Sequence, residues 1–141
     1  MKSSMPRTFC LLNHQLTQKQ ITELETTFCS EKVLYPEAEL AMMWAQINPE
    51  NDAQLLIDRV IMWLQLAKSG DYFVVQGEFG TTFKLVDYAL KNNLIPIYAT
   101  TKRIAKEVRE GEQVHREYIF EHVCFKKYEY FEEKNESFVI L

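Results

Sequence analysis

Residues 71–83 constrain the fold more than any other stretch of this 141-residue chain. The run Tyr72–Gln76 is apolar and β-rich, Gly77 and Gly80 follow it, and a helical pattern begins directly afterwards. A strand that ends in a glycine-containing turn and leads into a helix is how many α/β folds build a ligand site. The same Gly-x-x-Gly spacing also fits a packing turn, with a positive φ at one glycine and a close helix–strand approach at the other. From the turn alone, both interpretations stay open.

Strand-like and helix-like segments alternate through the first hundred residues. Short apolar runs predict four strands, over Thr8–Leu12, Lys32–Tyr35, Tyr72–Gln76 and Leu94–Ala99. Helical spacing of apolar residues predicts helices from the Thr17 capping box to Phe28, over 37–47, from Asn51 or Asp52 to Ala67, and from Thr81 or Thr82 to Asn92. This order predicts an α/β fold: a mainly parallel, Rossmann-like sheet flanked by helices, with right-handed crossovers.

The pattern changes after Ala99. The runs Ile104–Arg109 and Val114–Phe120 alternate polar and apolar residues and are typical of a β-hairpin, which Phe120–Lys126 would continue as a further strand. We therefore predict a single domain with a parallel core over 8–99, a C-terminal β-hairpin extension over 100–128 and a tail over 129–141. The apolar end of that tail, 138–141, is expected to dock on the domain or on a partner subunit.

Charge and hydropathy exclude some classes of protein. The net charge of −4 argues against a protein that coats duplex nucleic acid, because such a protein needs a broad basic face. No apolar run approaches the roughly 18 residues of a membrane helix, and residues 1–7 lack the apolar segment of a signal peptide. Cys10, Cys29 and Cys124 form no Cys-x-x-Cys pair and are expected to be reduced thiols packed in the core. We therefore expect a soluble, cytoplasmic protein with no membrane or duplex partner.

Polar residues follow three of the predicted strands. They are Asn13 and His14 after the first, Gln76, Gly77, Glu78, Phe79, Gly80, Thr81 and Thr82 after the third, and Thr100, Thr101, Lys102 and Arg103 after the fourth. Ligands of an open parallel sheet bind beyond the carboxyl ends of its strands, so we expect the three groups to converge on one site. Lys102 and Arg103 beside the amino end of the helix after Gly80 would form a phosphate site in an otherwise acidic protein.

Each candidate also has a structural explanation. His14 fits a turn or a helix cap, and one of the two threonines after Gly80 fits an N-cap. Lys102 and Arg103 fit a solvated pair, as most short charge runs do. Glu78 fits a residue that faces solvent.

Several kinds of site are not encoded in the sequence. It contains no G-x-x-x-x-G-K, no complete G-x-G-x-x-G and no G-x-S-x-G. No H-x-x-x-H or Cys/His ligand spacing occurs, so neither a metal nor a cofactor is predicted. The sequence identifies no partner for His115 or His122. An enzyme built on this chain would rely on positioning and electrostatics rather than on a strong nucleophile.

Three stretches resemble small stand-alone CRISPR-associated proteins with a CARF-type Rossmann fold: Gln76–Thr81, Ile95–Arg103 and Phe120–Phe125. Leu11–Thr17 and Leu34–Pro36 are similar too, and the resemblance covers roughly residues 8–128. It implies a homodimer whose ligand lies across the two-fold axis, over the carboxyl ends of the strands.

The resemblance implies a ring nuclease that switches off type III CRISPR antiviral signalling. Such proteins bind a cyclic oligoadenylate, here expected to be cyclic tetra-adenylate, and open the ring without a metal. A ribose 2′-hydroxyl attacks the neighbouring phosphate in line and leaves a 2′,3′-cyclic phosphate. Holding that geometry and stabilising the charged transition state is all that the protein must do.

The resemblance also suggests roles for the residues after the strands. Those expected to act on the reacting groups are Arg103, Lys102, Thr82 and His14. Those expected to hold the ligand are Asn13, Gln76, Gly77, Glu78, Phe79, Gly80, Thr81, Thr100 and Thr101. Two alternatives stay open: a non-catalytic sensor or sponge for the same messenger, and an unrelated Rossmann-like regulatory domain that binds a mononucleotide or nothing.

Overall fold

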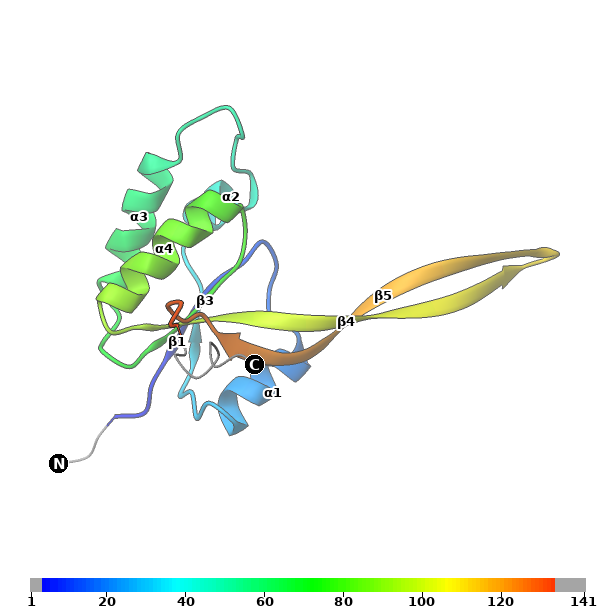
Figure 1. The fold of residues 1–141 in the computed structure, drawn as a ribbon, viewed down its shortest axis with the longest axis horizontal. Helices are drawn as coiled ribbons and strands as arrows, with labels where there is room; N and C mark the ends of the chain where they lie inside the picture. Colours follow the sequence, from blue (N-terminus) through cyan, green and yellow to red (C-terminus); the bar gives the residue numbers. More distant parts are fainter. Residues whose placement is uncertain (1–3, 134–141) are drawn as a thin grey trace, which may run out of the picture.

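A five-stranded mixed sheet organises the computed structural model, which describes residues 4–133 (Figure 1). The strands, in the spatial order β2-β1-β3-β4-β5, are β1 (Thr8–Leu11), β2 (Val33–Leu34), β3 (Tyr72–Val75), β4 (Ile95–Glu110) and β5 (Gln113–Lys127). The first four are parallel to their neighbours, and β5 is antiparallel to β4. The predicted α/β class and the mainly parallel core are therefore confirmed. Strand order reverses between β1 and β3, which is where ligands bind in sheets of this kind.

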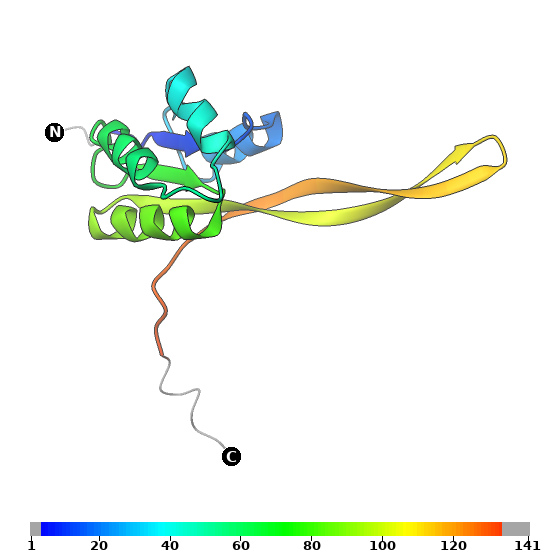
Figure 2. The ribbon, with the colours of Figure 1, turned by 90° about the horizontal axis from the view of Figure 1, so that it is seen from above.

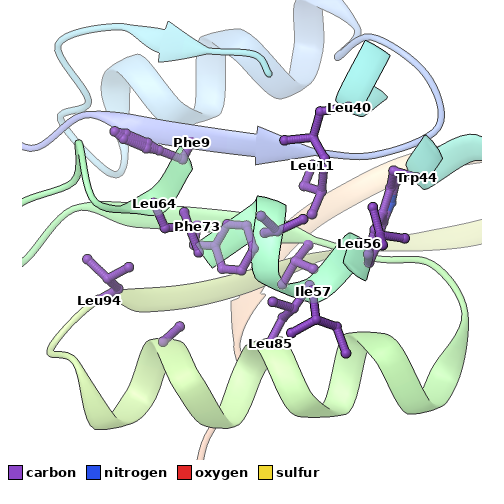
Figure 3. Packing of buried hydrophobic residues seen from close by; sticks show 13 residues of the cluster. Phe9, Leu11, Leu40, Trp44, Leu56, Ile57, Leu64, Phe73, Leu85 and Leu94 are labelled. Carbon is purple, nitrogen blue, oxygen red and sulfur yellow. The ribbon is translucent and has the colours of Figure 1, made fainter. Parts of the chain in front are cut away.

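Within residues 4–133, four helices cover the two faces of the sheet. They are α1 (Gln18–Thr26), α2 (Ala38–Ala45), α3 (Gln54–Leu64) and α4 (Phe79–Lys91). Alternate residues of the strands face opposite sides, so Cys10 and Val74 pack toward Leu24 of α1, whereas Phe9 and Phe73 pack in the cluster of α2, α3 and α4. Figure 3 shows this larger cluster between the sheet and the helices. Burial on both faces explains why the core strands are almost continuously apolar.

Local capping decides where the helices start, and some of these starts differ from those that the sequence predicted. The predicted capping box at α1 is confirmed, because Thr17 and Gln20 satisfy each other's backbone N–H groups. The predicted starts of α3 at Asn51 or Asp52 are wrong, since Ala53 is the N-cap. The predicted start of α4 at Thr81 or Thr82 is also wrong: the helix begins at Phe79, because the Glu78 carboxylate caps it.

The two motif glycines serve different purposes. Gly70 and Gly111 are the described glycines with positive φ, so neither Gly77 nor Gly80 is needed for a left-handed turn. At Gly77 an added Cβ would lie 2.6 Å from Cζ2 of Trp44, so only glycine fits there. Gly80 lies inside the first turn of α4, where an added Cβ would meet nothing closer than 3.4 Å.

The last two strands form a long hairpin. β4 spans 16 residues and β5 spans 15, so the predicted break after Ala99 is wrong: 95–99 and 104–109 belong to one strand. The continuation of the hairpin through 120–126 is confirmed. The paired segments Thr101–Glu110 and Gln113–His122, here called the arm, project away from the helices (Figures 1 and 2). A register shift between Thr100 and Thr101 marks the root of the arm.

Three further expectations concern the cysteines, membrane helices and the tail. Cys10 is buried and Cys124 half-buried, but Cys29 is exposed at a positive φ of 55°, so the expectation of three core thiols is wrong for Cys29. No helix in the described part of the chain is long and apolar enough to cross a membrane. The expected docking of residues 138–141 lies outside the described residues.

Candidate functional site

A cavity of about 660 Å³ opens where the order of the strands reverses. Six of the predicted site residues line it: Asn13, His14, Gln76, Gly77, Glu78 and Thr101. The other walls come from the start of α1, from α2 and from β5, through Thr17, Gln20, Trp44, Ala45, Ile47, Phe120 and His122 among others. The predicted convergence of the three groups is confirmed for these six residues, and their roles in binding stay predictions.

Gln76 forms the floor of the cavity. Its side-chain Oε1 accepts the Ala99 N–H at 2.8 Å, and its Nε2 donates to the Ala99 carbonyl at 3.4 Å. Its own carbonyl accepts the indole N–H of Trp44 at 3.1 Å. These bonds join β3 to β4 just beyond their parallel ladder and fix the wall at Trp44. Gln76 is therefore held in place by the fold before any ligand arrives.

The carboxylate of Glu78 already occupies the amino end of α4. Oε2 of Glu78 accepts the Thr81 N–H at 2.7 Å. That bond, with the Thr81 hydroxyl, the Gly80 N–H and Lys84, holds the pKa of the exposed Glu78 carboxyl below its usual 4.5. Glu78 is exposed, as expected, and in addition it caps the helix, which the sequence did not indicate. A phosphate at this helix terminus would have to displace Glu78 and would be repelled by its charge.

Four predicted site residues of the turn face other hollows. Gly80 and Thr81 line a hollow of about 240 Å³ between α4 and the loop before α3. Phe79 and Thr82 line a largely apolar hollow of about 430 Å³ beside Tyr128. The Thr82 hydroxyl is buried, with no hydrogen-bond partner among the described residues. The structure therefore does not bring a Gly77–Thr82 phosphate cradle together.

The two predicted cations lie outside the cavity. Residues 100–103 belong to β4 rather than to a loop, so neighbouring side chains alternate between its faces. Arg103 lies on the face of Thr101 and stacks over the Tyr118 ring, with Cζ 4.3 Å from the ring centroid. Lys102 lies on the opposite face. Thr100 donates its hydroxyl to the Cys124 carbonyl at 2.7 Å and does not line the cavity. A corner with both cations side by side does not form within one chain.

His122 is a cavity residue that the sequence did not identify. It is only 8% exposed, and its Nε2 lies 2.6 Å from Oε1 of Glu23. Its Nδ1 lies 3.5 Å from Nε2 of Gln20. Because Oε1 of Gln20 accepts the Thr17 N–H, the amide must present its NH₂ to Nδ1. Nδ1 therefore accepts from Gln20, and Nε2–H donates to Glu23.

His14 is held differently. It is exposed, and its Nδ1 lies 2.9 Å from the carbonyl oxygen of Gln15. A carbonyl only accepts, so Nδ1 carries the proton and Nε2 of the neutral ring keeps a free lone pair. Of the two histidines that line the cavity, His14 is the one with a nitrogen available to a ligand.

The cavity has few ionisable groups of its own. His14, Glu78 and His122 are the ionisable residues that line it, and none of the described lining residues is Lys or Arg. Within the described residues, no three His, Cys, Asp or Glu side chains are placed to hold a metal ion. The cavity thus offers hydrogen-bonding groups and an imidazole, and any positive charge must come from elsewhere.

Comparison with known proteins identifies relatives over almost the whole described chain. A family model described as "Uncharacterized protein MJ1673 family" matches residues 6–126. A protein of Methanocaldococcus jannaschii, named "Uncharacterized protein MJ1673", is 37% identical over 126 residues, which span 88% of this chain and 98% of the relative. No solved structure matches the chain.

Proposed function

This chain belongs to the MJ1673 family, and we propose that it is a ring nuclease that opens cyclic oligoadenylate, with cyclic tetra-adenylate as the preferred ring. In this proposal the sheet is a CARF-type Rossmann-like fold, and the protein acts as a cytoplasmic homodimer that ends type III CRISPR signalling. The observation that carries the proposal is the cavity at the reversal of strand order, where His14, Gln76 and Thr101 meet from three segments. Its volume lies within the roughly 300–1,000 Å³ of small-ligand sites.

The chemistry requires few groups. The 2′-oxygen forms a bond to phosphorus, the bond from phosphorus to the 5′-oxygen breaks, and the products are a 2′,3′-cyclic phosphate and a 5′-hydroxyl. Nε2 of His14 accepts the proton of the attacking 2′-hydroxyl, because its lone pair is free. Water or the same imidazolium protonates the leaving 5′-oxygen. No metal is needed in this scheme.

The other residues position the ring. Asn13 and Thr101 offer amide and hydroxyl groups to ribose or base at the cavity wall. Phe120 is 68% exposed at the cavity rim, where a base can stack on its ring. Arg103, on the same face of the arm, is the better placed of the two predicted cations to reach a phosphate. The buried Thr82 hydroxyl has no part in the scheme.

One observation favours a second candidate, a sensor or sponge that binds the messenger without cutting it. None of the described lining residues is a cation, and stabilising a phosphorane-like transition state normally needs one. Incubation with excess labelled cyclic tetra-adenylate in EDTA separates the candidates. A linear product that ends in a 2′,3′-cyclic phosphate supports the nuclease, and a stable complex of intact ring supports the sensor. If no cyclic oligoadenylate raises the melting temperature, both are wrong.

A further inference from the structure

The arm is the part of the structure with the least support from the rest of the chain. Its ten residue pairs, from Thr101–His122 to Glu110–Gln113, give a length of roughly 34 Å at ~3.4 Å per residue. Apart from the half-buried Val108, every residue from 101 to 120 is exposed. A two-stranded ribbon is marginally stable alone in water. We therefore expect a partner to pack on an arm of this length and stabilise it.

The two faces of the arm differ in composition. The face that continues the cavity, here called the cavity face, carries Thr101, Arg103, Ala105, Glu107 and Arg109 of β4 opposite His122, Phe120, Tyr118, Arg116 and Val114 of β5. The other face carries Lys102, Ile104, Lys106, Val108 and Glu110 opposite Glu121, Ile119, Glu117, His115 and Gln113. Protein interfaces are enriched in aromatic residues and Arg and depleted in Lys and Glu. The cavity face has the composition of an interface, and the other face has that of a solvated surface.

The charge of the arm argues against a polyanionic partner. Residues 101–122 contain five Lys and Arg and five Asp and Glu, so the difference is zero. Binding of single-stranded nucleic acid would need a surplus of positive charge along the strand. A second copy of the chain, with the same alternation of charges and rings, is the better fit.

We propose that two copies pack the cavity faces of their arms together, antiparallel, about a two-fold axis at the level of Ala105 and Tyr118. In each strand, a residue that lies some positions before that level then faces the residue of the second copy that lies the same number of positions after it. Arg103 meets Glu107 of the second copy. Phe120 meets Arg116 of the second copy, a cation–π pair, and the two Tyr118 rings meet each other. Arg103, Glu107 and Arg116 thus each face an opposite charge or a ring.

Other axes fit the charges less well. An axis at Arg103 sets two arginines together, and an axis at Glu107 sets two carboxylates together. With the axis at Ile104, Arg103 would meet Ala105 of the second copy. With the axis at Lys106, it would meet Arg109, so neither position pairs Arg103 with a carboxylate. A two-fold axis parallel to the arm would make the two arms parallel and would place the helices of both copies at the same end of the dimer. There the two copies of α1, each of which contacts His122 on the cavity face, would both lie between the arms at the same level.

The antiparallel arrangement completes the cavity. Arg109 of each arm lies opposite Thr101 of the other copy, beside the cavity that Thr101 lines. The positive charge that no described lining residue supplies would thus come from Arg109 of the second copy. This last step rests on the proposed function. Arg109→Gln is expected to leave the dimer intact and to weaken binding of cyclic tetra-adenylate at least about tenfold. Unchanged binding would remove Arg109 from the site.

The dimer itself is tested without any nucleotide. Analytical ultracentrifugation of the wild type is expected to give a dimer, Tyr118→Asp a monomer, and Ile119→Asp a dimer. Tyr118 and Ile119 are both 49% exposed neighbours on opposite faces, so they form a matched pair. A monomeric wild type, a dimeric Tyr118→Asp, or loss of the dimer in both variants would overturn the arrangement, as would a monomer whose arm binds single-stranded RNA.

A charge exchange tests the register. Arg103→Glu and Glu107→Arg, singly, set like charges against each other and are expected to raise the dimer dissociation constant at least about tenfold. The double variant restores the pairs and is expected to return the constant to within about threefold of wild type. If the double variant instead showed the sum of the two single losses of dimer affinity, the register would be contradicted. A dimer that neither binds nor cleaves the messenger would refute the proposed function alone, and a cleaving monomer would refute this inference alone.

Discussion

Nε2 of His122 lies 2.6 Å from Oε1 of Glu23, although 99 positions separate the two residues in the sequence. The second carboxylate oxygen of Glu23 accepts the Phe125 N–H at 2.9 Å. Through this one carboxylate, α1 holds the root of the arm and one wall of the cavity. Removing it leaves a buried imidazole and a backbone N–H without an acceptor.

Glu23→Ala is therefore expected to lower the free energy of unfolding by about 2–3 kcal/mol, measured by urea denaturation. Glu25→Ala, an exposed carboxylate on the same helix, serves as the control and is expected to change stability by less than about 0.5 kcal/mol. Equal effects of the two substitutions would show that the Glu23–His122 bond does not support the fold.

The motif glycines should respond differently to alanine. Gly77→Ala puts a Cβ against the Trp44 ring, which is pinned by its bond to the Gln76 carbonyl, and is expected to cost about 1–3 kcal/mol. Gly80→Ala is expected to be neutral or to stabilise by up to about 1 kcal/mol, because the residue is helical and unobstructed. Thermal unfolding of both variants checks this, and a more harmful change at Gly80 would refute the assignment.

The Glu78 cap predicts a pH dependence with a definite sign. The pKa of Glu78 is lower in the folded protein than its ordinary 4.5, so the unfolded state binds the proton more readily. The stabilisation by the carboxylate is present above about pH 4.5 and is lost as the pH falls through the lowered pKa. The stability difference between wild type and Glu78→Gln should therefore shrink below pH 4.5. A difference that grows on acidification would contradict the cap.

His14→Ala is expected to lower turnover of cyclic tetra-adenylate at least about tenfold while leaving binding largely intact, because the imidazole acts on the proton rather than on affinity. His115→Ala changes an exposed imidazole on the other face of the arm and is expected to leave turnover unchanged. Single-turnover assays with a labelled ring compare the two. Full activity in His14→Ala would remove this residue from the mechanism.

The sequence predicted the parts of the fold that local pattern controls. Apolar runs located the four parallel strands, the Thr17 capping box located α1, and polar residues after β1 and β3 marked the cavity. The start of α4 was misplaced because Glu78, rather than a threonine, supplies the cap. The unbroken length of β4 was missed because an exposed ribbon has no buried face to give it a pattern.

The contacts of His122 with α1 could not be predicted from local sequence pattern. Gln20 and Glu23 are one helical turn apart, so their polar side chains share a side of α1, and Gln20 was already singled out by the capping box. Nothing in the spacing reveals that the partner is a histidine of β5. Likewise, that Lys102 and Arg103 point to opposite faces follows only once both are known to lie inside a strand.

Turnover of labelled cyclic tetra-adenylate in EDTA tests the central claim most directly, with Arg103→Ala beside the wild type. We expect the wild type to produce linear product ending in a 2′,3′-cyclic phosphate, and Arg103→Ala to do so at least about tenfold more slowly. Intact ring after prolonged incubation with excess protein would contradict the assignment as a ring nuclease.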